Sequence, residues 1–166
     1  MRRYLTCIAL VLPLCSLAFA ADDEASRASL KGLRGIYLVI QNLDPPEEQA
    51  GLTTADIRTD VELKLRLAGI PVLSEDQWLN TRGGAYLYVK VEVFARADSA
   101  WPYTSTVSVT QHVTLDRTPT IATWGSTWSV DILGSVGSLK VRSIRDRLKD
   151  QVDQFINAYL AVNPKK

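Results

Sequence analysis

Apolar and polar residues alternate along the middle of the chain, a pattern typical of half-buried β-strands. Three such stretches follow one another, at residues 85–97, 104–116 and 121–133. The segments that separate them, 98–102 and 116–120, each contain a proline and are expected to be turns. The pattern therefore predicts an antiparallel meander of three strands.

The alternation also assigns the side chains of these strands to two faces. One face of the first strand carries Leu87, Val89 and Val91, and the opposite face carries Tyr86, Tyr88 and Phe94. In the second strand His112 falls on a face rich in threonine and serine. In the third strand, Trp124 and Trp128 share a face with Val130 and Ile132, so both tryptophans are expected in the core.

Apolar residues three or four positions apart predict two amphipathic helices. The first follows Thr53, whose side chain is expected to cap it, and ends at Gly69. The second is expected to run from a cap at Ser138 to Asn163, and short apolar runs at 36–40 and 70–73 predict a buried strand and an edge strand. The expected fold class is α+β: a single β-α-β-β-β-β-α domain with a mostly antiparallel sheet and both helices packed on one face.

The first 20 residues have the pattern of a cleaved export signal. Arg2 and Arg3 precede an apolar run at 5–17, and Ala18-Phe19-Ala20 offers the small residues that signal peptidase requires. The run is shorter than the roughly 20 apolar residues of a membrane-spanning helix. We therefore expect cleavage after Ala20 and a periplasmic or secreted protein with no membrane span.

Beyond the predicted signal, the pattern divides the chain into three parts. Residues 21–34 are polar and acidic and are expected to form a flexible leader. Residues 35–163 are expected to form the single domain, and residues 164–166 a charged tail.

Composition excludes several kinds of chemistry. Cys7 and Cys15 both lie in the predicted signal, so the mature chain is expected to have no disulfide, no thiolate nucleophile and no cysteine-bound zinc. The 19 basic and 18 acidic residues nearly balance, so the chain lacks the large net positive charge that would attract nucleic acid. With one histidine, a zinc or copper site would have to rely on carboxylates, and we expect neither a metal nor a cofactor.

No sequence motif identifies a catalytic residue. His112 would need an acidic partner, and Glu92 on the neighbouring strand is the candidate, with a serine nearby as an optional third group. A Gly-x-Ser-x-Gly elbow is missing, because Ser129 stands at the last position of the stretch that begins at Gly125. The alternative for His112 is a solvated polar residue.

Aromatic residues form the candidate binding surface. If the helices cover only one face, Tyr86, Tyr88 and Phe94 are exposed on the other, close to His112. Trp101 and Tyr103, expected at a hairpin tip, are further candidates for exposed aromatics. The alternative is that tyrosine and threonine are there for their strand propensity, and that the rings at the turn pack onto the domain.

The element order resembles that of small α+β domains of Gram-negative envelope proteins. The features that carry the resemblance are the helix-to-strand passage at 61–72, the strand meander, and the closing helix through Phe155 and Tyr159. The families it resembles are the N-terminal domain of the translocation protein TolB and the lipopolysaccharide-assembly lipoprotein LptE. The resemblance implies docking onto envelope partners and carries over no functional residue.

These observations favour a non-catalytic exported module that binds an envelope protein, or a second copy of itself, through the exposed sheet face or a sheet edge. Two alternatives stay open: a small periplasmic hydrolase or lyase that uses His112 and Glu92, and a carrier of an apolar small molecule between sheet and helices.

Overall fold

The computed structural model describes residues 20–45, 48, 51–94, 100–137 and 143–164. The predicted signal residues 1–19, the predicted cap Ser138 and the last two tail residues lie outside these ranges. No helix among the described residues is long and apolar enough to cross a membrane.

One mixed sheet of six strands forms the centre of an α+β fold, with the strand order β1-β6-β5-β4-β2-β3. The strands are β1 (Ala20–Ala21), β2 (Ile36–Ile40), β3 (Val72–Leu73), β4 (Ala85–Val93), β5 (Ala100–Leu115) and β6 (Thr118–Gly137). β4, β5 and β6 form the predicted antiparallel meander, and β1 pairs antiparallel with β6. β2 is parallel to both of its neighbours, β3 and β4.

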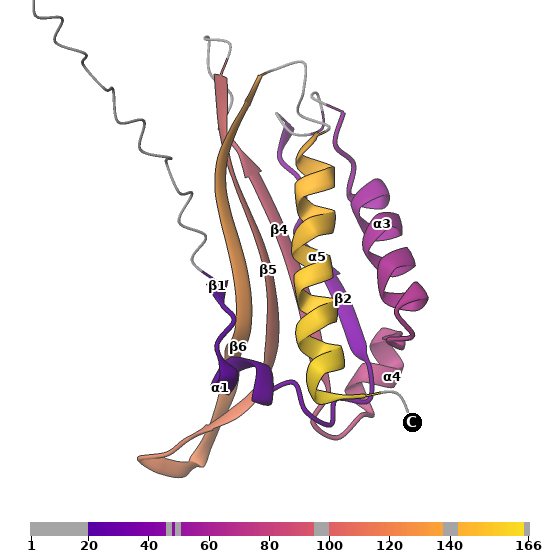
Figure 1. The fold of residues 1–166 in the computed structure, drawn as a ribbon. Coiled ribbons are helices and arrows are strands. Elements are labelled where there is room, and N and C mark those ends of the chain that lie inside the picture. The colour runs from indigo at the N-terminus through magenta and orange to yellow at the C-terminus, as the bar shows by residue number, and fades with distance from the viewer. Residues whose placement is uncertain (1–19, 46–47, 49–50, 95–99, 138–142, 165–166) are drawn as a thin grey trace, which may run out of the picture.

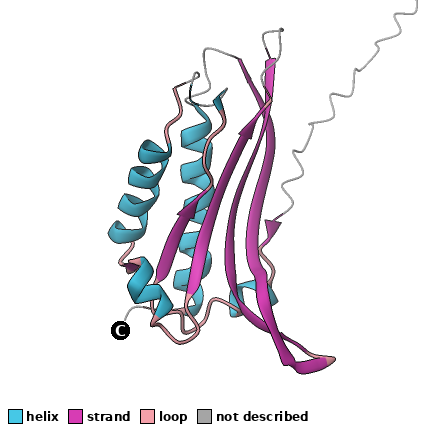
Figure 2. Ribbon diagram, turned by 180° about the vertical axis from the view of Figure 1, so that it is seen from behind, coloured by secondary structure: helices cyan, strands magenta, loops and turns pink. Residues whose placement is uncertain are grey.

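Two long helices, α3 (Thr54–Leu67) and α5 (Ser143–Val162), lie side by side on one side of the sheet (Figure 1). We call the sheet face that they cover the inner face, and the opposite one the outer face. Thr53 caps α3 as predicted, because its side chain accepts a hydrogen bond from the Asp56 backbone N–H at 3.0 Å. Seen from behind, the strands curve past the helices, and the tip of the β5–β6 hairpin projects beyond them (Figure 2).

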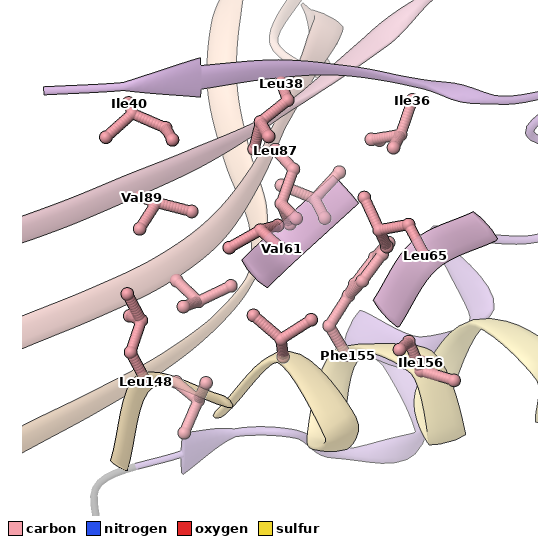
Figure 3. Packing of buried hydrophobic residues seen from close by; sticks show 14 of the residues in the cluster. Ile36, Leu38, Ile40, Val61, Leu65, Leu87, Val89, Leu148, Phe155 and Ile156 are labelled. Atoms are coloured by element: carbon pink, nitrogen blue, oxygen red, sulfur yellow. The ribbon is translucent and has the colours of Figure 1, made fainter. Parts of the chain in front are cut away.

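The core lies between the inner face and the two long helices (Figure 3). Alternate residues of β4, among them Leu87 and Val89, are buried against it, as the period-two pattern predicts. Helix α3 contributes Ile57, Val61 and Leu65, and the ring of Phe155 on α5 packs 5.5 Å from that of Trp128. The predicted packing of both helices on one face is confirmed.

Two short helices were not predicted: α1 (Glu24–Ala28) and α4 (Glu75–Leu79). Helix α1 lies in the segment expected to be a flexible leader, and that expectation is wrong. Leu30 and Leu33, which follow α1, are buried in the core. The domain therefore includes this segment and does not begin at residue 35.

Helix α4 lies on the outer face because of how the chain crosses β2. Ile36 of β2 aligns with Val72 of β3 on one side and with Ala85 of β4 on the other. The chain thus moves from β2 out to β3 and then back past β2 to β4. Right-handed crossovers that run in opposite directions along a sheet lie on opposite faces. Helix α3 accordingly covers the inner face, and Trp78 of α4 stacks on Tyr37, an outer-face residue of β2.

A β-bulge in β6 changes which face Trp124 occupies. Val109 pairs with Trp128, but the next residue, Thr110, pairs with Ser126, so Thr127 is an extra residue on β6. The bulge shifts the alternation by one position. Trp128 is buried on the inner face at 1% exposure, whereas Trp124 lies on the outer face and is 45% exposed. The expectation that both tryptophans belong to the core is wrong for Trp124.

Candidate functional site

The outer face gathers aromatic side chains from five separate elements: β2, α4, β4, β5 and β6. Trp78 stacks on Tyr37 with ring centroids 5.1 Å apart, and meets Tyr86 edge-on at 5.9 Å. Trp124 lies 5.7 Å from both Trp78 and Tyr86. The ring of His112 stands perpendicular to that of Trp124 at 4.4 Å. We call these five residues the aromatic cluster; their spacings are those at which aromatic pairs attract each other.

Local sequence explains why Trp78 reaches the sheet. Ser74 and Gln77 form a capping box at the start of α4, with hydrogen bonds of 2.9 and 3.2 Å between side chains and backbone. Gly84, just before β4, allows close approach, because a Cβ there would lie 2.8 Å from the Trp78 carbonyl oxygen and 2.9 Å from its ring. The sequence signals for α4 were therefore present in the Ser-x-x-Gln spacing.

A half-open cavity of about 230 Å³ adjoins the aromatic cluster. One wall is the segment from Trp78 to Gly84, and the other is formed by two residues of the β5–β6 hairpin. The described lining residues are Trp78, Leu79, Thr81, Gly83, Gly84, His112 and Trp124. The cavity lies on the outer face, away from the core between sheet and helices where an apolar carrier was expected to hold its ligand.

The predicted surface residues Tyr86 and Tyr88 lie on the outer face, opposite Leu87 and Val89, and are half-buried. Tyr86 belongs to the aromatic cluster. Tyr88 lies further along β4, where its hydroxyl donates to Gln41 on the segment after β2. Phe94, the residue after β4, is 53% exposed. Only Tyr86 and His112 of the predicted surface join the cluster.

Trp101 and Tyr103 are not exposed aromatics at a hairpin tip. Both lie within β5, and both face the inner side of the sheet. Tyr103 is 4% exposed, and burial raises the pKa of its hydroxyl. Its ring covers Gly134 on β6, where a Cβ would lie 2.6 Å from it, and Trp101 is half-buried against the core. The prediction that these rings are exposed is wrong.

His112 and Glu92 are too far apart to act together. Glu92 pairs with Thr104, eight positions before His112 on β5, which at 3.3 Å per residue is roughly 26 Å along the strand. Glu92 instead pairs with Lys90 at 2.9 Å and accepts a hydrogen bond from Thr104. The arrangement does not support the predicted acid–base pair. No group of three potential metal ligands occurs among the described residues.

Three members of the aromatic cluster were missed as site residues. Tyr37 was assigned only to a buried strand, Trp78 lay in an unrecognised helix, and Trp124 was placed in the core. The capping box could have identified α4, whereas nothing in the local pattern of β6 reveals a bulge that depends on pairing with β5.

Comparisons with known proteins show no family for this chain. No family model matches the sequence, and no curated protein matches it. Among solved structures, it is similar to a minor lipoprotein from Acinetobacter baumannii, with 11% sequence identity over 78% of this chain and 93% of that chain. The TM-score of 0.30 is too low to carry an argument about function. The resemblance to the TolB and LptE domains stays a prediction.

Proposed function

We propose that the protein is a non-catalytic binding module of the cell envelope that captures a protein partner through the outer face of its sheet. The observation that carries this proposal is the aromatic cluster beside a half-open cavity. Exposed tryptophan and tyrosine that are packed together are enriched at the energetic centres of protein interfaces. The predicted export signal supports a periplasmic location.

Polar groups around the cluster fit a recognition surface better than a reaction centre. The neighbouring outer-face positions on β5 and β6, such as Thr110 paired with Ser126, carry small hydroxyls. A reaction centre needs a base or nucleophile oriented by a second group. The one imidazole of the cluster, His112, contacts an indole, and the carboxylate predicted to assist it lies at the far end of β4.

The test is capture of a partner from cross-linked envelope extract by purified protein, followed by mass spectrometry. Trp124→Ser should reduce recovery of the partner at least tenfold, because Trp124 is exposed at the centre of the surface. Leu133→Ser is the matched control, since Leu133 lies on the same strand and the same face and is 79% exposed, but is remote from the cluster.

Equal recovery by wild type and Trp124→Ser would contradict the proposal, provided that circular dichroism shows both to be folded. Recovery of further copies of the same chain would identify the partner as a homo-oligomer, which light scattering of the purified protein would then detect as a mass that Trp124→Ser lowers.

A further inference from the structure

We infer that the cavity beside the aromatic cluster receives a single aromatic side chain, a tryptophan, tyrosine or phenylalanine, of the protein partner. This inference rests on the proposed function and specifies the chemistry of the group recognised. Four properties of the cavity lead to it: the charge of its lining, its hydrogen-bonding groups, its size and the geometry of its rings.

The lining carries no permanent charge. None of the described residues that form it is an aspartate, glutamate, lysine or arginine. A charged ligand would lose its hydration on entering and would gain no opposite charge in return. A cation would gain only the attraction of the indole rings in return, and an anion site would be expected to hold an arginine or lysine. The occupant is therefore neutral.

The hydrogen-bonding groups do not match a sugar. Besides the two indoles, the polar side chains of the lining are Thr81 and His112, and the Thr81 hydroxyl already donates to the Gln77 carbonyl at 2.6 Å. The lining has no carboxylate or carboxamide side chain to accept from sugar hydroxyls. Burying several hydroxyls without partners is costly. The lining therefore favours an apolar ring over a polyhydroxylated one.

The size of the cavity fits one ring system attached to something larger. Its volume is about 230 Å³, whereas a cavity of about 150 Å³ is enough for benzene and sites for drug-sized molecules measure about 300–1,000 Å³. Because the cavity is half-open, a free molecule of this size would bury only part of its surface. Useful affinity then requires further contacts on the outer face, which a side chain on a protein partner supplies.

The arrangement of the aromatic rings beside the cavity can accommodate one further ring. Trp78, Tyr86 and Trp124 are mutually tilted or edge-on at 5.7–5.9 Å. A fourth ring in the cavity can meet Trp78 and Trp124 in the same tilted geometry, which adds attraction beyond the burial of area. Gly83 and Gly84, which also line the cavity, have no side chains that would obstruct such a ring.

The experiment titrates the purified protein with N-acetyl-tryptophanamide and follows backbone and indole N–H signals by NMR. We expect saturable shifts at residues 78–84, 112 and 124. N-acetyl-alaninamide, which lacks the ring, and methyl glucoside, which has hydroxyls in its place, should bind at least tenfold more weakly. Equal binding of either control probe, or no saturable shift with N-acetyl-tryptophanamide, would overturn the inference.

Two variants locate the binding. Trp124→Ala should weaken binding of N-acetyl-tryptophanamide at least tenfold and Leu79→Ala several-fold. Leu79 is 66% exposed, so its replacement leaves the fold intact and keeps the test valid even if Trp124→Ala disturbs the hairpin. Leu133→Ala is the control and should bind like wild type. Unchanged binding by both cavity variants would contradict the assignment.

Failure of this inference can be told from failure of the proposed function. Excess N-acetyl-tryptophanamide should release a captured partner. Capture that depends on Trp124 but is not released by the probe would contradict the ring-binding cavity and leave the proposed function standing. Saturable probe binding without any captured partner or self-association would contradict the proposed function and support the cavity assignment alone.

Discussion

The buried indole of Trp128 is hydrogen-bonded to a carboxylate near the N-terminal end of the described chain. Its Nε1–H donates to Asp22 at 3.0 Å, and Asp22 also binds Arg27 through two hydrogen bonds of 2.6 and 2.7 Å. The bond to Arg27 is the main cause that lowers the pKa of Asp22; burial opposes it, and the bond from Trp128 assists it. Asp22 lies in the polar and acidic stretch that was expected to form a flexible leader.

Stability should therefore depend on the ionisation of Asp22. Because the pKa of Asp22 is lower in the folded state than its ordinary value of 3.8, its contribution is present above that value and is lost as the pH falls through the lowered pKa. We expect Asp22→Asn to cost about 0.5–1 kcal/mol at neutral pH, since the pair is partly exposed. Urea unfolding from pH 7 to pH 2 should show this difference shrinking; a difference independent of pH would contradict the role of the charge.

Tyr103 and Gly134 form a cross-strand pair. The ring of Tyr103 occupies the space that a side chain at position 134 would need. We expect Gly134→Ala to lower the free energy of unfolding by about 1–3 kcal/mol, because the new Cβ would overlap the ring. Ser135→Ala, at the exposed neighbouring position, is the control. In the background Tyr103→Leu the cost of Gly134→Ala should fall, and thermal unfolding of the four variants would reveal an unchanged cost if the ring were irrelevant.

Helix α5 is fixed to the sheet by a fully buried amide. Gln151 accepts a hydrogen bond from the Ser105 hydroxyl at 2.7 Å and donates to the carbonyls of Ser105 and Val130 at 3.1 and 3.0 Å. Three polar groups on two strands, β5 and β6, thus form hydrogen bonds with one side chain of the helix. This contact gives α5 a defined position along the strands, which apolar packing alone specifies less strictly.

Replacing this amide should be costly although the replacement is apolar. We expect Gln151→Leu to destabilise the protein by about 2–4 kcal/mol, because it removes three buried hydrogen bonds, among them the one that the Ser105 hydroxyl donates. Gln154→Leu, at an exposed position of the same helix, should change the free energy of unfolding by less than about 0.5 kcal/mol. Equal effects of the two substitutions in urea titrations would refute the role of the amide.

Elements whose pattern is local could be predicted, and those set by distant partners could not. The alternation of β4 and the spacing of α3 follow from residues within each element. The fold class and the burial of one face of β4 against the helices were therefore predicted correctly. The face of Trp124 depends on the bulge at Thr127, which exists only in the pairing with β5. Helix α1 has no buried residue of its own, and its place is fixed by Asp22 and by Leu30 after it.

Hydrogen bonds connect the segment after α1 to the C-terminal end of α5. The Tyr159 hydroxyl donates to the Leu33 carbonyl at 2.6 Å. Asn163 accepts from the Gly32 backbone at 2.7 Å and donates to the Leu30 carbonyl at 2.9 Å. With Leu30 and Leu33 buried beside them, these contacts attach the segment after α1 to the last turns of α5.

Removal of the N-terminal segment should accordingly destabilise the whole molecule. We expect a chain that starts at Gly35 to be less stable than one that starts at Ala21 by about 3–6 kcal/mol, since burial of each leucine contributes about 1.5–3 kcal/mol. Chemical unfolding of both chains measures the difference. Equal stability would restore the interpretation of residues 21–34 as a leader.

The joining of the two ends also sets the order in which the molecule can fold. Leu30 and Leu33 are synthesised well before their partners at the end of α5, which lie 133 and 126 residues later in the chain. Contacts between segments this distant in sequence form slowly, because a long loop must close before they are gained. The nascent chain therefore exposes the part of the inner face that α5 covers until α5 has been made. Through that interval it exposes apolar surface of the kind that chaperones bind.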